Sequence, residues 1–403
     1  MVFCSGRESG GMETLNYLAR CVLTLWRLCG TILRLWTCLL KESNVRSLSY
    51  VLAFLFTTAA FATPIVETFP ICTAPGNQSV PAISGNIVVW QDNRAVNPGI
   101  YGYNLETKTE FPISTERGDV SWLPPDIDGN IVVWCVGGYI RVYNLVTQAV
   151  FDVCSSGQAT WPKVNGNLIV WMDGRKNTIM TSDWDIYGYD IQTGQEFPIV
   201  TEPGNQMNPS VYGNQVLFDQ RVDNGYNQVF SFTPSDVTSA PGILAGTLHN
   251  QSNYFRDGDW LVWIDDRNGS SILGTGAGNT DIYGYNFATG QETAICTARY
   301  EQWHPVISDP IIAWQDFRNG QWDIYGYSLV SVSTPEFLIC NNIGAQGVPD
   351  IDGKYFVWTD YRTGEGDIWG ASIVHMPEPE TIVLLVMAAT GITVMFRRRR
   401  DGE

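Results

Sequence analysis

The sequence predicts an all-β fold, a seven-bladed β-propeller of four-stranded blades, and three observations lead to it. A short pattern recurs seven times, with spacings of 44, 37, 47, 45, 51 and 44 residues between its most prominent aromatic side chains. Periods of about 40–50 residues with several strands each are typical of propeller blades. The 39 glycines, 12% aromatic residues and only 16% charged residues indicate an all-β protein with many turns. A strand-like segment before the first repeat supplies the piece that the last repeat lacks.

Each repeat is predicted to supply four strands in a fixed order. The first is a short Pro-x-Ile/Val segment that ends in a Gly-Asn type turn, as in residues 81–86. The third reads Ile-Tyr-Gly-Tyr, as in 324–327, and the fourth follows a Thr-Gly turn, as in 195–199. The second strand is apolar and ends in an aromatic residue, which in chain order is Trp90, Trp134, Trp171, Phe218, Trp263, Trp314 and Trp358.

The extra strand at the start of the repeats predicts how the ring closes. Residues 67–72 match the fourth strands at 196–201 and 292–297, whereas the seventh repeat ends at Ile373 after three strands. We therefore expect the N-terminal strand to complete the last blade. This arrangement leaves the ring without an open end.

The propeller is predicted to span residues 63–376, preceded by an N-terminal extension with a signal peptide, residues 1–62. An apolar run at 47–62 ends in Ala-Phe-Ala, so cleavage is expected between Ala62 and Thr63. The segment before it, 15–40, is apolar with three arginines at seven-residue spacing. It indicates either a helix lying on a membrane surface or a start codon assigned too early.

The C-terminal residues 377–403 resemble the PEP-CTERM sorting signal of bacterial surface proteins. The apolar run 381–396 would form a helix of roughly 24 Å, short for a hydrocarbon core of about 30 Å, and a basic cluster would stay on the cytoplasmic side. The resemblance implies export through the inner membrane, transient anchoring by this predicted transmembrane helix, and processing by an exosortase-type partner. A plain C-terminal anchor is the alternative. The matching residues are Pro377, Glu378, Pro379, Arg397, Arg398, Arg399 and Arg400.

The repeats themselves resemble the TolB-type (WD-like) propeller family, as found in microbial surface proteins. The resemblance lies in the pattern V-W-x-D-x-R followed by D-I-Y-G-Y, and it extends over the whole predicted propeller. It implies a propeller and often a surface that faces a protein or a glycan, but no single activity. Repeat two departs at Cys135-Val136-Gly137, and repeat four is one residue short at Phe218-Asp219-Gln220-Arg221.

Most conspicuous residues recur in the repeats, so we interpret them as scaffold. The repeated Trp and Tyr are expected to pack between blades rather than to stack on sugars. Two Asp-x-Asp-Gly segments, 126–129 and 350–353, resemble fragments of calcium loops but lack the distal Glu, so turns are predicted there. Five Asp-x-Arg pairs are expected to form a repeated ion pair or turn clamp, namely Asp92/Arg94, Asp173/Arg175, Asp265/Arg267, Asp316/Arg318 and Asp360/Arg362.

The remaining composition restricts the chemistry. The sequence has only three histidines and no H-E-x-x-H motif, so we expect no bound metal and no cofactor. A propeller that resembles oligogalacturonate lyase would need a histidine-rich metal centre. Residues 63–376 carry 14 basic and 34 acidic residues, a net charge of −20, which disfavours nucleic acid and leaves cation uptake at the surface open. No disulfide framework is expected, because equivalent positions on different outer strands are too far apart to pair; they hold Cys72, Cys154, Cys296 and Cys340.

One face of the predicted ring is the candidate binding surface. Loops between second and third strands should share a face with the blade-to-blade loops, and the two long insertions, 174–184 and 268–280, lie there. Aromatic residues that do not recur are expected just before the first strands on this face. We predict that they bind a glycan or a protein partner; the residues are Trp122, Trp161 and Trp303, with His304.

The predicted function is a non-catalytic binding or structural module, exported to the cell surface or the extracellular matrix. An alternative is an extracellular polysaccharide-active enzyme, a lyase or glycosidase, with a carboxylate site at the pore. Non-repeating pore carboxylates with perturbed pKa values would favour that alternative. A third interpretation is a Tol-like scaffold for a partner protein.

Overall fold

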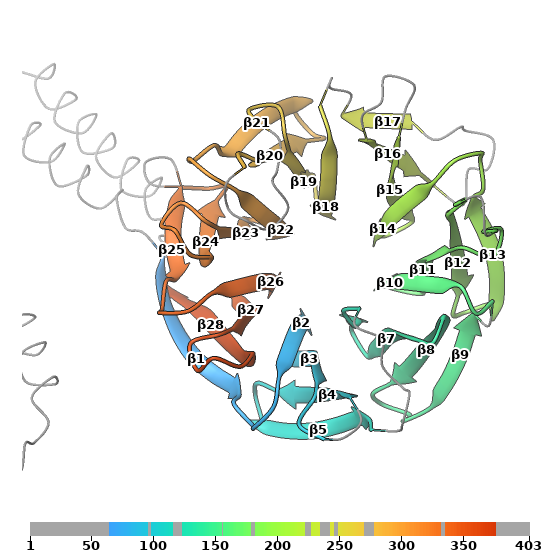
Figure 1. Cartoon of the computed structure of the whole chain (residues 1–403), viewed down its shortest axis with the longest axis horizontal. Coiled ribbons are helices and arrows are strands. Elements are labelled where there is room, and N and C mark those ends of the chain that lie inside the picture. Colours follow the sequence, from blue (N-terminus) through green and yellow to red (C-terminus); the bar gives the residue numbers. More distant parts are fainter. Residues whose placement is uncertain are drawn as a thin grey trace, which may run out of the picture. The chain divides into compact units, whose positions relative to one another are not determined.

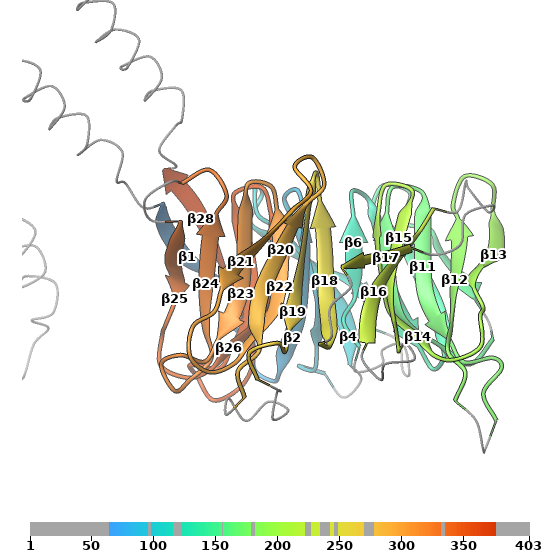
Figure 2. The ribbon, with the colours of Figure 1, turned by 90° about the horizontal axis from the view of Figure 1, so that it is seen from above.

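The computed structural model describes residues 64–375 apart from 96–97, 116–122, 155, 179–181, 222–226, 234–241, 246–248, 270–277 and 332–334. Within this part, seven four-stranded antiparallel sheets surround a central pore (Figure 1). The strands run between the two faces of the ring (Figure 2). Among these residues no helix is long and apolar enough to cross a bilayer. The predicted signal peptide, the sorting signal and the helix at 381–396 lie outside the described residues.

The blades are numbered in chain order, and within each the first strand lies next to the pore. Blade 1 contains β2 (Gln78–Ser84), β3 (Ile87–Asp92), β4 (Gly99–Asn104) and β5 (Thr109–Ser114). Blade 2 contains β6 (Asp126–Asp128), β7 (Ile131–Val136), β8 (Tyr139–Asn144) and β9 (Val150–Cys154). Blade 3 contains β10 (Ala159–Asn165), β11 (Leu168–Asp173), β12 (Asp185–Asp190) and β13 (Gln195–Val200).

The second half of the ring repeats this order. Blade 4 contains β14 (Gln206–Tyr212), β15 (Gln215–Arg221), β16 (Asn227–Phe232) and β17 (Gly242–Ala245). Blade 5 contains β18 (Gln251–Asp257), β19 (Trp260–Asp265), β20 (Asp281–Asn286) and β21 (Gln291–Cys296). Blade 6 contains β22 (Gln302–Ser308), β23 (Ile311–Asp316), β24 (Asp323–Ser328) and β25 (Glu336–Cys340). Blade 7 contains β26 (Gln346–Asp352), β27 (Tyr355–Asp360), β28 (Asp367–His375) and β1 (Ile65–Cys72).

The first strand of the chain closes the ring, as predicted. β1 pairs antiparallel with β28, so blade 7 is built from both ends of the propeller sequence (Figure 1). A Cβ at Gly370 of β28 would lie 2.9 Å from the Phe69 ring, just as a Cβ at Gly102 would lie 2.5 Å from the Phe111 ring in blade 1. The repeated Ile-Tyr-Gly-Tyr glycine thus makes room for an apolar side chain of the fourth strand, and β1 fills that role in blade 7.

The second strands form the core between blades. Their apolar runs are buried on both faces, which explains why they read as continuous apolar segments rather than as alternating ones. Their tryptophans are 0–1% exposed, which confirms the assignment of these residues to the core: Trp90, Trp134, Trp171, Trp263, Trp314 and Trp358. Each strand continues two residues beyond its tryptophan, rather than ending there as predicted. Several of these tryptophans stack on the tyrosine of the third strand, with 6.4 Å between the ring centroids of Trp314 and Tyr325.

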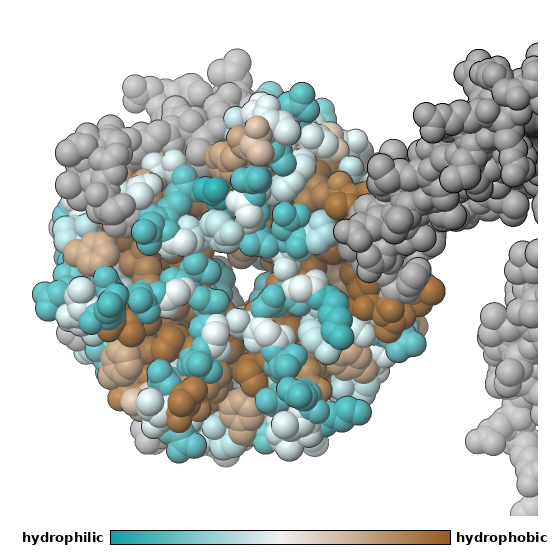
Figure 3. Space-filling view, turned by 180° about the vertical axis from the view of Figure 1, so that it is seen from behind, coloured by the Kyte–Doolittle hydropathy of each residue, from teal (hydrophilic) through white to brown (hydrophobic). Residues whose placement is uncertain are grey.

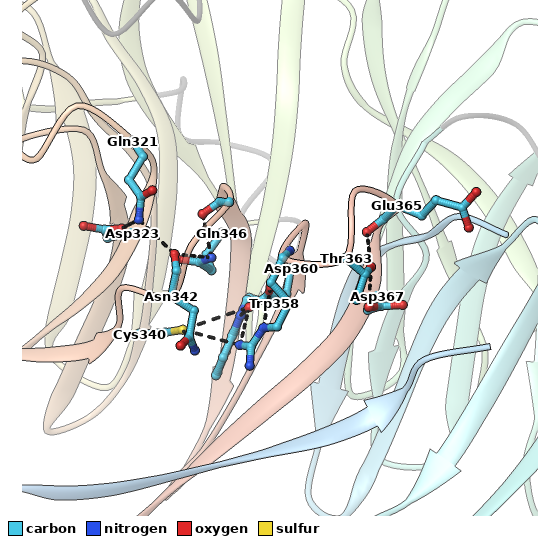
Figure 4. A network of polar contacts seen from close by, with 12 residues as sticks. Gln321, Asp323, Cys340, Asn342, Gln346, Trp358, Asp360, Thr363, Glu365 and Asp367 are labelled. Atoms are coloured by element: carbon cyan, nitrogen blue, oxygen red, sulfur yellow. Dashed lines mark hydrogen bonds and ion pairs between the residues drawn. The ribbon is translucent and has the colours of Figure 1, made fainter. Parts of the chain in front are cut away.

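The Asp-x-Arg pairs form the predicted clamp, and blade 6 shows all of its parts. Asp316 accepts hydrogen bonds from Trp314 Nε1 at 2.9 Å and from Arg318 Nη2 at 2.6 Å. Arg318 also contacts Glu336 of the outer strand at 2.5 Å and lies 4.1 Å from the Tyr325 ring centroid. Its guanidinium also lies 3.1 Å from Sγ of the buried Cys296 in the preceding blade. Arg362 and Cys340 make the same contact at the boundary between blades 6 and 7, where Figure 4 shows Cys340 together with Trp358 and Asp360.

Cysteines at the predicted equivalent positions thus lie at blade boundaries. The clamp arginine of the next blade points to each of them, with Nη2–Sγ distances from 3.0 to 3.8 Å. All five cysteines of the described region are buried free thiols. Burial raises the pKa of Cys296 to about 12, so this thiol is protonated and unreactive at neutral pH.

Candidate functional site

A repeated bulge brings one residue of nearly every blade to the mouth of the pore. The register of the first strand shifts by a bulge in six blades, and each bulge holds a non-glycine residue at a φ of 46–51°. A proline follows this residue in five of the six blades. Because proline has no backbone N–H, it leaves no unpaired donor on this edge strand. The left-handed residues are Val80, Trp161, Asn208, Asn253, His304 and Val348.

Blade 2 departs from this geometry for a simple reason. It has Pro124-Pro125 at the corresponding place, and a proline cannot adopt a positive φ. Its first strand, β6, accordingly starts only at Asp126 and has three residues, against seven in β10.

The bulge residues surround a cavity of about 230 Å³ at this end of the pore. The backbone geometry recurs from blade to blade, but the side chains do not: they are aliphatic, aromatic, carboxamide and imidazole groups. Left-handed conformations of such residues cost free energy and often mark binding sites. Constant geometry combined with variable chemistry is what a binding site on a repeat scaffold requires.

One charged cluster lies deeper in the same cavity. The residue after each bulge proline faces the pore, and in three blades it is charged: Asp126, Lys163 and Asp350. Lys163 Nζ donates to Asp126 Oδ1 at 2.9 Å and lies 5.5 Å from the ring centroid of Phe255. Asp350 Oδ2 accepts from the backbone N–H of Ile83 at 2.8 Å, which ties blade 7 to blade 1.

Burial shifts the titration of these groups. Burial raises the pKa of Asp350 to about 7, with the Lys163 ammonium working against the shift. Burial also raises the pKa of Asp126. Burial alone would lower the pKa of Lys163, but the charge of Asp126 and its hydrogen bond outweigh this and raise it. Burial lowers the pKa of His304 to about 4, so this imidazole is neutral at pH 7. The mouth therefore holds an ion pair, a carboxyl group that titrates near neutrality, and uncharged side chains.

The two Asp-x-Asp-Gly segments divide into two roles. The second carboxylates anchor the turn of the next blade, because Gly166 N donates to Asp128 Oδ2 and Gly85 N donates to Asp352 Oδ2, both at 2.6 Å. Asn165 accepts in the same way from Gly213 N at 2.8 Å. These polar residues line the other end of the pore, where Figure 3 shows an opening ringed mostly by hydrophilic groups. The turn interpretation fits these second residues, whereas the first residues, Asp126 and Asp350, belong to the cavity.

The three tryptophans and the histidine that were predicted to bind a ligand lie in different places. Trp161 is 41% exposed and lines the cavity, as does His304. Trp303 packs beside the cavity, with its ring centroid 5.9 Å from that of His304 and 6.4 Å from that of Trp322. Trp122 lies outside the described residues.

The expected position of these residues before the first strands is wrong. Trp161 lies within β10 and Trp303 within β22, because the bulge lets each strand continue through its proline. The insertion loops do share a face with the blade-to-blade loops: Trp184 O accepts from Gln206 N at 2.7 Å, and Thr280 O from Gln302 N at 2.9 Å.

The pore residues Asp126, Lys163 and Asp350 were not predicted as site residues. A signal for them exists, since aligning the residue after each first-strand proline compares them with Ala82, Ser210 and Val306. Charged side chains at a position that is otherwise small or apolar stand out in that alignment. In the part of the chain that the structure describes, three or more His, Cys, Asp or Glu side chains nowhere gather in a way that could hold a metal ion.

Comparisons with known proteins support the fold alone. No protein-family model matches the sequence, and no curated protein matches it either. Among solved structures, an oligogalacturonate lyase from Vibrio parahaemolyticus is similar, with a TM-score of 0.57, 12% identity, and coverage of 79% of this chain and 99% of the lyase. The β-propeller domain of the trilobed protease from Pyrococcus furiosus has a TM-score of 0.55 and 11% identity, covering 73% of this chain and 95% of that domain.

These similarities combine the same fold with different functions. The Pyrococcus domain is described as having an open velcro topology, whereas here β1 completes blade 7. TolB from Acinetobacter baumannii is also similar, at a TM-score of 0.43 and 12% identity over 70% of this chain and 58% of TolB. That score adds nothing to the fold already described. At these identities, activity has to be argued from the residues of this chain.

Proposed function

We propose that this protein is a non-catalytic glycan-binding propeller of the cell surface or extracellular matrix, with its site at the bulge-lined mouth of the pore. The observation behind the proposal is the exposed indole of Trp161 beside the neutral His304 and the carboxamides of Asn208 and Asn253. The C–H face of a sugar ring packs on an aromatic ring, and its hydroxyl groups need a few fixed hydrogen-bond partners. The lining offers both.

Export belongs to the same proposal. The segment ending at Ala62 would direct secretion, and the PEP-CTERM-like residues 377–403 would anchor the chain until an exosortase-type enzyme processes it. Intact mass of the protein recovered from the cell surface tests this. We expect a start at Thr63 and an end near Pro377, and a chain that retains residues 381–396 would contradict processing.

Trp161→Ala is expected to weaken binding at least tenfold, because it removes the most exposed aromatic surface of the mouth. The measurement is affinity electrophoresis in gels that contain extracellular polysaccharides, followed by calorimetry with the polysaccharide that retards the wild-type protein. Val146→Ala serves as control, since Val146 is 71% exposed but lies in the β8–β9 turn, away from the cavity. Retardation that is unchanged in Trp161→Ala, or binding of a protein partner alone, would contradict the proposal.

A second candidate function, polysaccharide cleavage, is favoured by one specific observation. The carboxyl groups of Asp126 and Asp350 occupy a position that is a carboxylate in two of the seven blades, lie in one cavity with Lys163, and have raised pKa values. Such groups are typical of acid–base catalysis. The test is release of new reducing ends or unsaturated products from a bound polysaccharide. Release that disappears in Asp126→Asn and Asp350→Asn, while binding persists, would replace the binding module by an enzyme.

A further inference from the structure

Blade 6 carries a chain of aromatic side chains that the pore site does not use. Phe317 and Trp322, from the β23–β24 loop, are 5.1 Å apart between ring centroids, and Tyr300, from the β21–β22 loop, lies 6.5 Å from Phe317. Trp322 continues to Trp303 at 6.4 Å, and Trp303 to His304 at 5.9 Å. All five side chains are half-buried. We call Tyr300, Phe317, Trp322 and Trp303 the aromatic track; it ends at the cavity, because His304 lines the cavity wall.

The track is specific to blade 6. Single members have counterparts elsewhere, with Trp184 of blade 3 at the position of Trp322 and Tyr361 of blade 7 at the position of Phe317, but the residue at the position of Trp303 is Thr160 in blade 3 and Gly347 in blade 7. Packing between blades recurs around the ring, as the second-strand tryptophans show, so it does not account for a continuous set of four aromatic side chains in blade 6. Their presence calls for an explanation that is local to this face.

Tyr300 supplies a second, independent observation. Its φ is 74°, in the left-handed region, and the corresponding residues of other blades are glycines at φ values of 76–102°: Gly76, Gly157, Gly204 and Gly344. A side chain does not fit at two of these, since a Cβ on Gly76 would lie 2.9 Å from the backbone of Arg94, and one on Gly344 would lie 2.7 Å from Tyr361 O. Among the described residues at this position, Tyr300 alone places a side chain in a conformation that favours glycine. Backbone strain of this kind is retained where the side chain is needed.

Trp303 also has a feature that is unfavourable for the stability of the fold. Its indole N–H is buried without a hydrogen-bond partner in the structure. A buried unpaired donor is unfavourable for folding. Two unfavourable features thus occur in one continuous aromatic surface that leads to the cavity.

The size of the cavity limits what it can enclose. At about 230 Å³ it is smaller than the roughly 300–1,000 Å³ of sites for drug-sized ligands. It holds one ring-sized group, so any longer ligand has to extend out of the pore. The track provides the apolar surface along which it can extend.

The charges around the cavity and the track favour an uncharged glycan over an anionic one. In the cavity the ammonium of Lys163 is already paired with Asp126. On the track the nearby cation is Arg299, whose guanidinium lies 4.6 Å from the Tyr300 ring centroid at the outer end. The propeller as a whole, with its net charge of −20, repels polyanions.

We infer that the ligand is an uncharged linear glycan, bound with its terminal sugar in the pore cavity and its following sugars on the aromatic track of blade 6. This inference rests on the proposed glycan-binding function and specifies its ligand class and direction. Each track ring that stacks on a sugar should add about threefold to tenfold in affinity. The affinity should therefore rise with chain length up to the length of the track.

The experiment is calorimetry with cello-, manno- and malto-oligosaccharides of one to six residues, with oligogalacturonates of the same lengths as anionic counterparts. We expect a neutral series whose affinity rises at least tenfold from one to four residues. Tyr300→Gly and Trp322→Ala should lower the affinity for the long chains about threefold to tenfold and leave the monosaccharide unchanged, whereas Trp161→Ala should weaken every length.

Two controls distinguish a loss of binding from a loss of folding. Tyr300→Gly installs the residue that four other blades use, so its melting temperature should not fall. Tyr361→Ala removes an exposed tyrosine, 40% accessible, from blade 7 outside the track and should change no affinity. Affinity that is independent of length, or unchanged by both track variants while Trp161→Ala abolishes binding, overturns the track and leaves the pore site. Preference for oligogalacturonates overturns the uncharged ligand, and absence of binding to any saccharide overturns the pore site as well.

Discussion

Deleting residues 64–72 is expected to abolish cooperative folding of the propeller. The deletion removes β1, whose Ile71 and Cys72 are 8% and 5% exposed, and whose Val66 and Phe69 are partly buried against blade 7 and its neighbours. At about 1.5–3 kcal/mol for each fully buried side chain, the loss is on the order of 5 kcal/mol. That is comparable to the whole stability of many domains, about 5–15 kcal/mol. It also leaves β28 as an exposed edge that is open to aggregation.

A circular permutant separates loss of the strand from loss of the sequence order. His375 pairs with Ile65, so a two-residue Asn-Gly turn can join the end of β28 directly to the start of β1. A chain that begins at Thr73 and ends with this turn and residues 65–72 should recover a single cooperative urea transition. The same permutant with Phe69→Asp and Ile71→Asp should not. A deleted chain that unfolds at the same urea midpoint as the undeleted propeller, residues 63–376, would contradict the closure argument.

The ring closure was predictable because the repeats allow strands to be counted. The segment Glu67 to Cys72 matches the fourth strands of other repeats, and blade 7 lacks a fourth strand of its own. In the structure this strand is two residues longer than predicted, because β1 starts at Ile65. Repetition also made the clamp and the tryptophan core predictable, because a residue that recurs in most blades has a structural role that recurs with it.

The site was less predictable, because it depends on which way single residues point. The bulge in the first strand changes the alternation of side chains, and it places Trp161 and His304 in the cavity while Trp303 packs beside it. The pattern of residue types does not reveal that shift. Pore residues such as Asp350 come together from blades far apart in the sequence, so only the closed ring places them in one cavity.

Blade 4 shows how strongly the position of one carboxylate along a strand matters. Its segment Phe218-Asp219-Gln220-Arg221 has one residue fewer than the Trp-x-Asp-x-Arg pattern of other blades, so Asp219 follows Phe218 directly. The Asp219 side chain therefore points to the face opposite that of the clamp aspartates. On that face, in other blades, Met172 and Gln315 accept hydrogen bonds from the backbone of the next blade. Asp219 is 1% exposed there, and its hydrogen-bond donor is the uncharged amide of Asn208 at 3.2–3.3 Å. The sequence revealed the missing residue but not where the carboxyl group would lie.

Asp219→Asn is expected to remove a large part of the pH dependence of stability between pH 4 and 8. Burial raises the pKa of Asp219 to about 7 from 3.8. Because the folded state holds this proton more tightly than the unfolded state, its contribution is fully present below about pH 4 and is lost as the pH rises through 7. At 1.36 kcal/mol per pKa unit, Asp219 alone should make the unfolding free energy of the wild-type protein fall by up to about 4 kcal/mol over this range. The variant should lack that fall.

Urea unfolding at several pH values from 5 to 8 measures this slope. Asp173 is a useful internal contrast: burial alone would raise its pKa, but hydrogen bonds from Arg175 and Trp171 lower it to about 2, so its contribution is lost only below pH 4. Asp173→Asn should therefore lower stability at every pH from 5 to 8 without changing the slope. Asp350→Asn, at the other carboxyl group with a pKa of about 7, should flatten the slope by a similar amount. An Asp219→Asn variant that keeps the wild-type slope would mean that Asp219 is ionised in the folded protein.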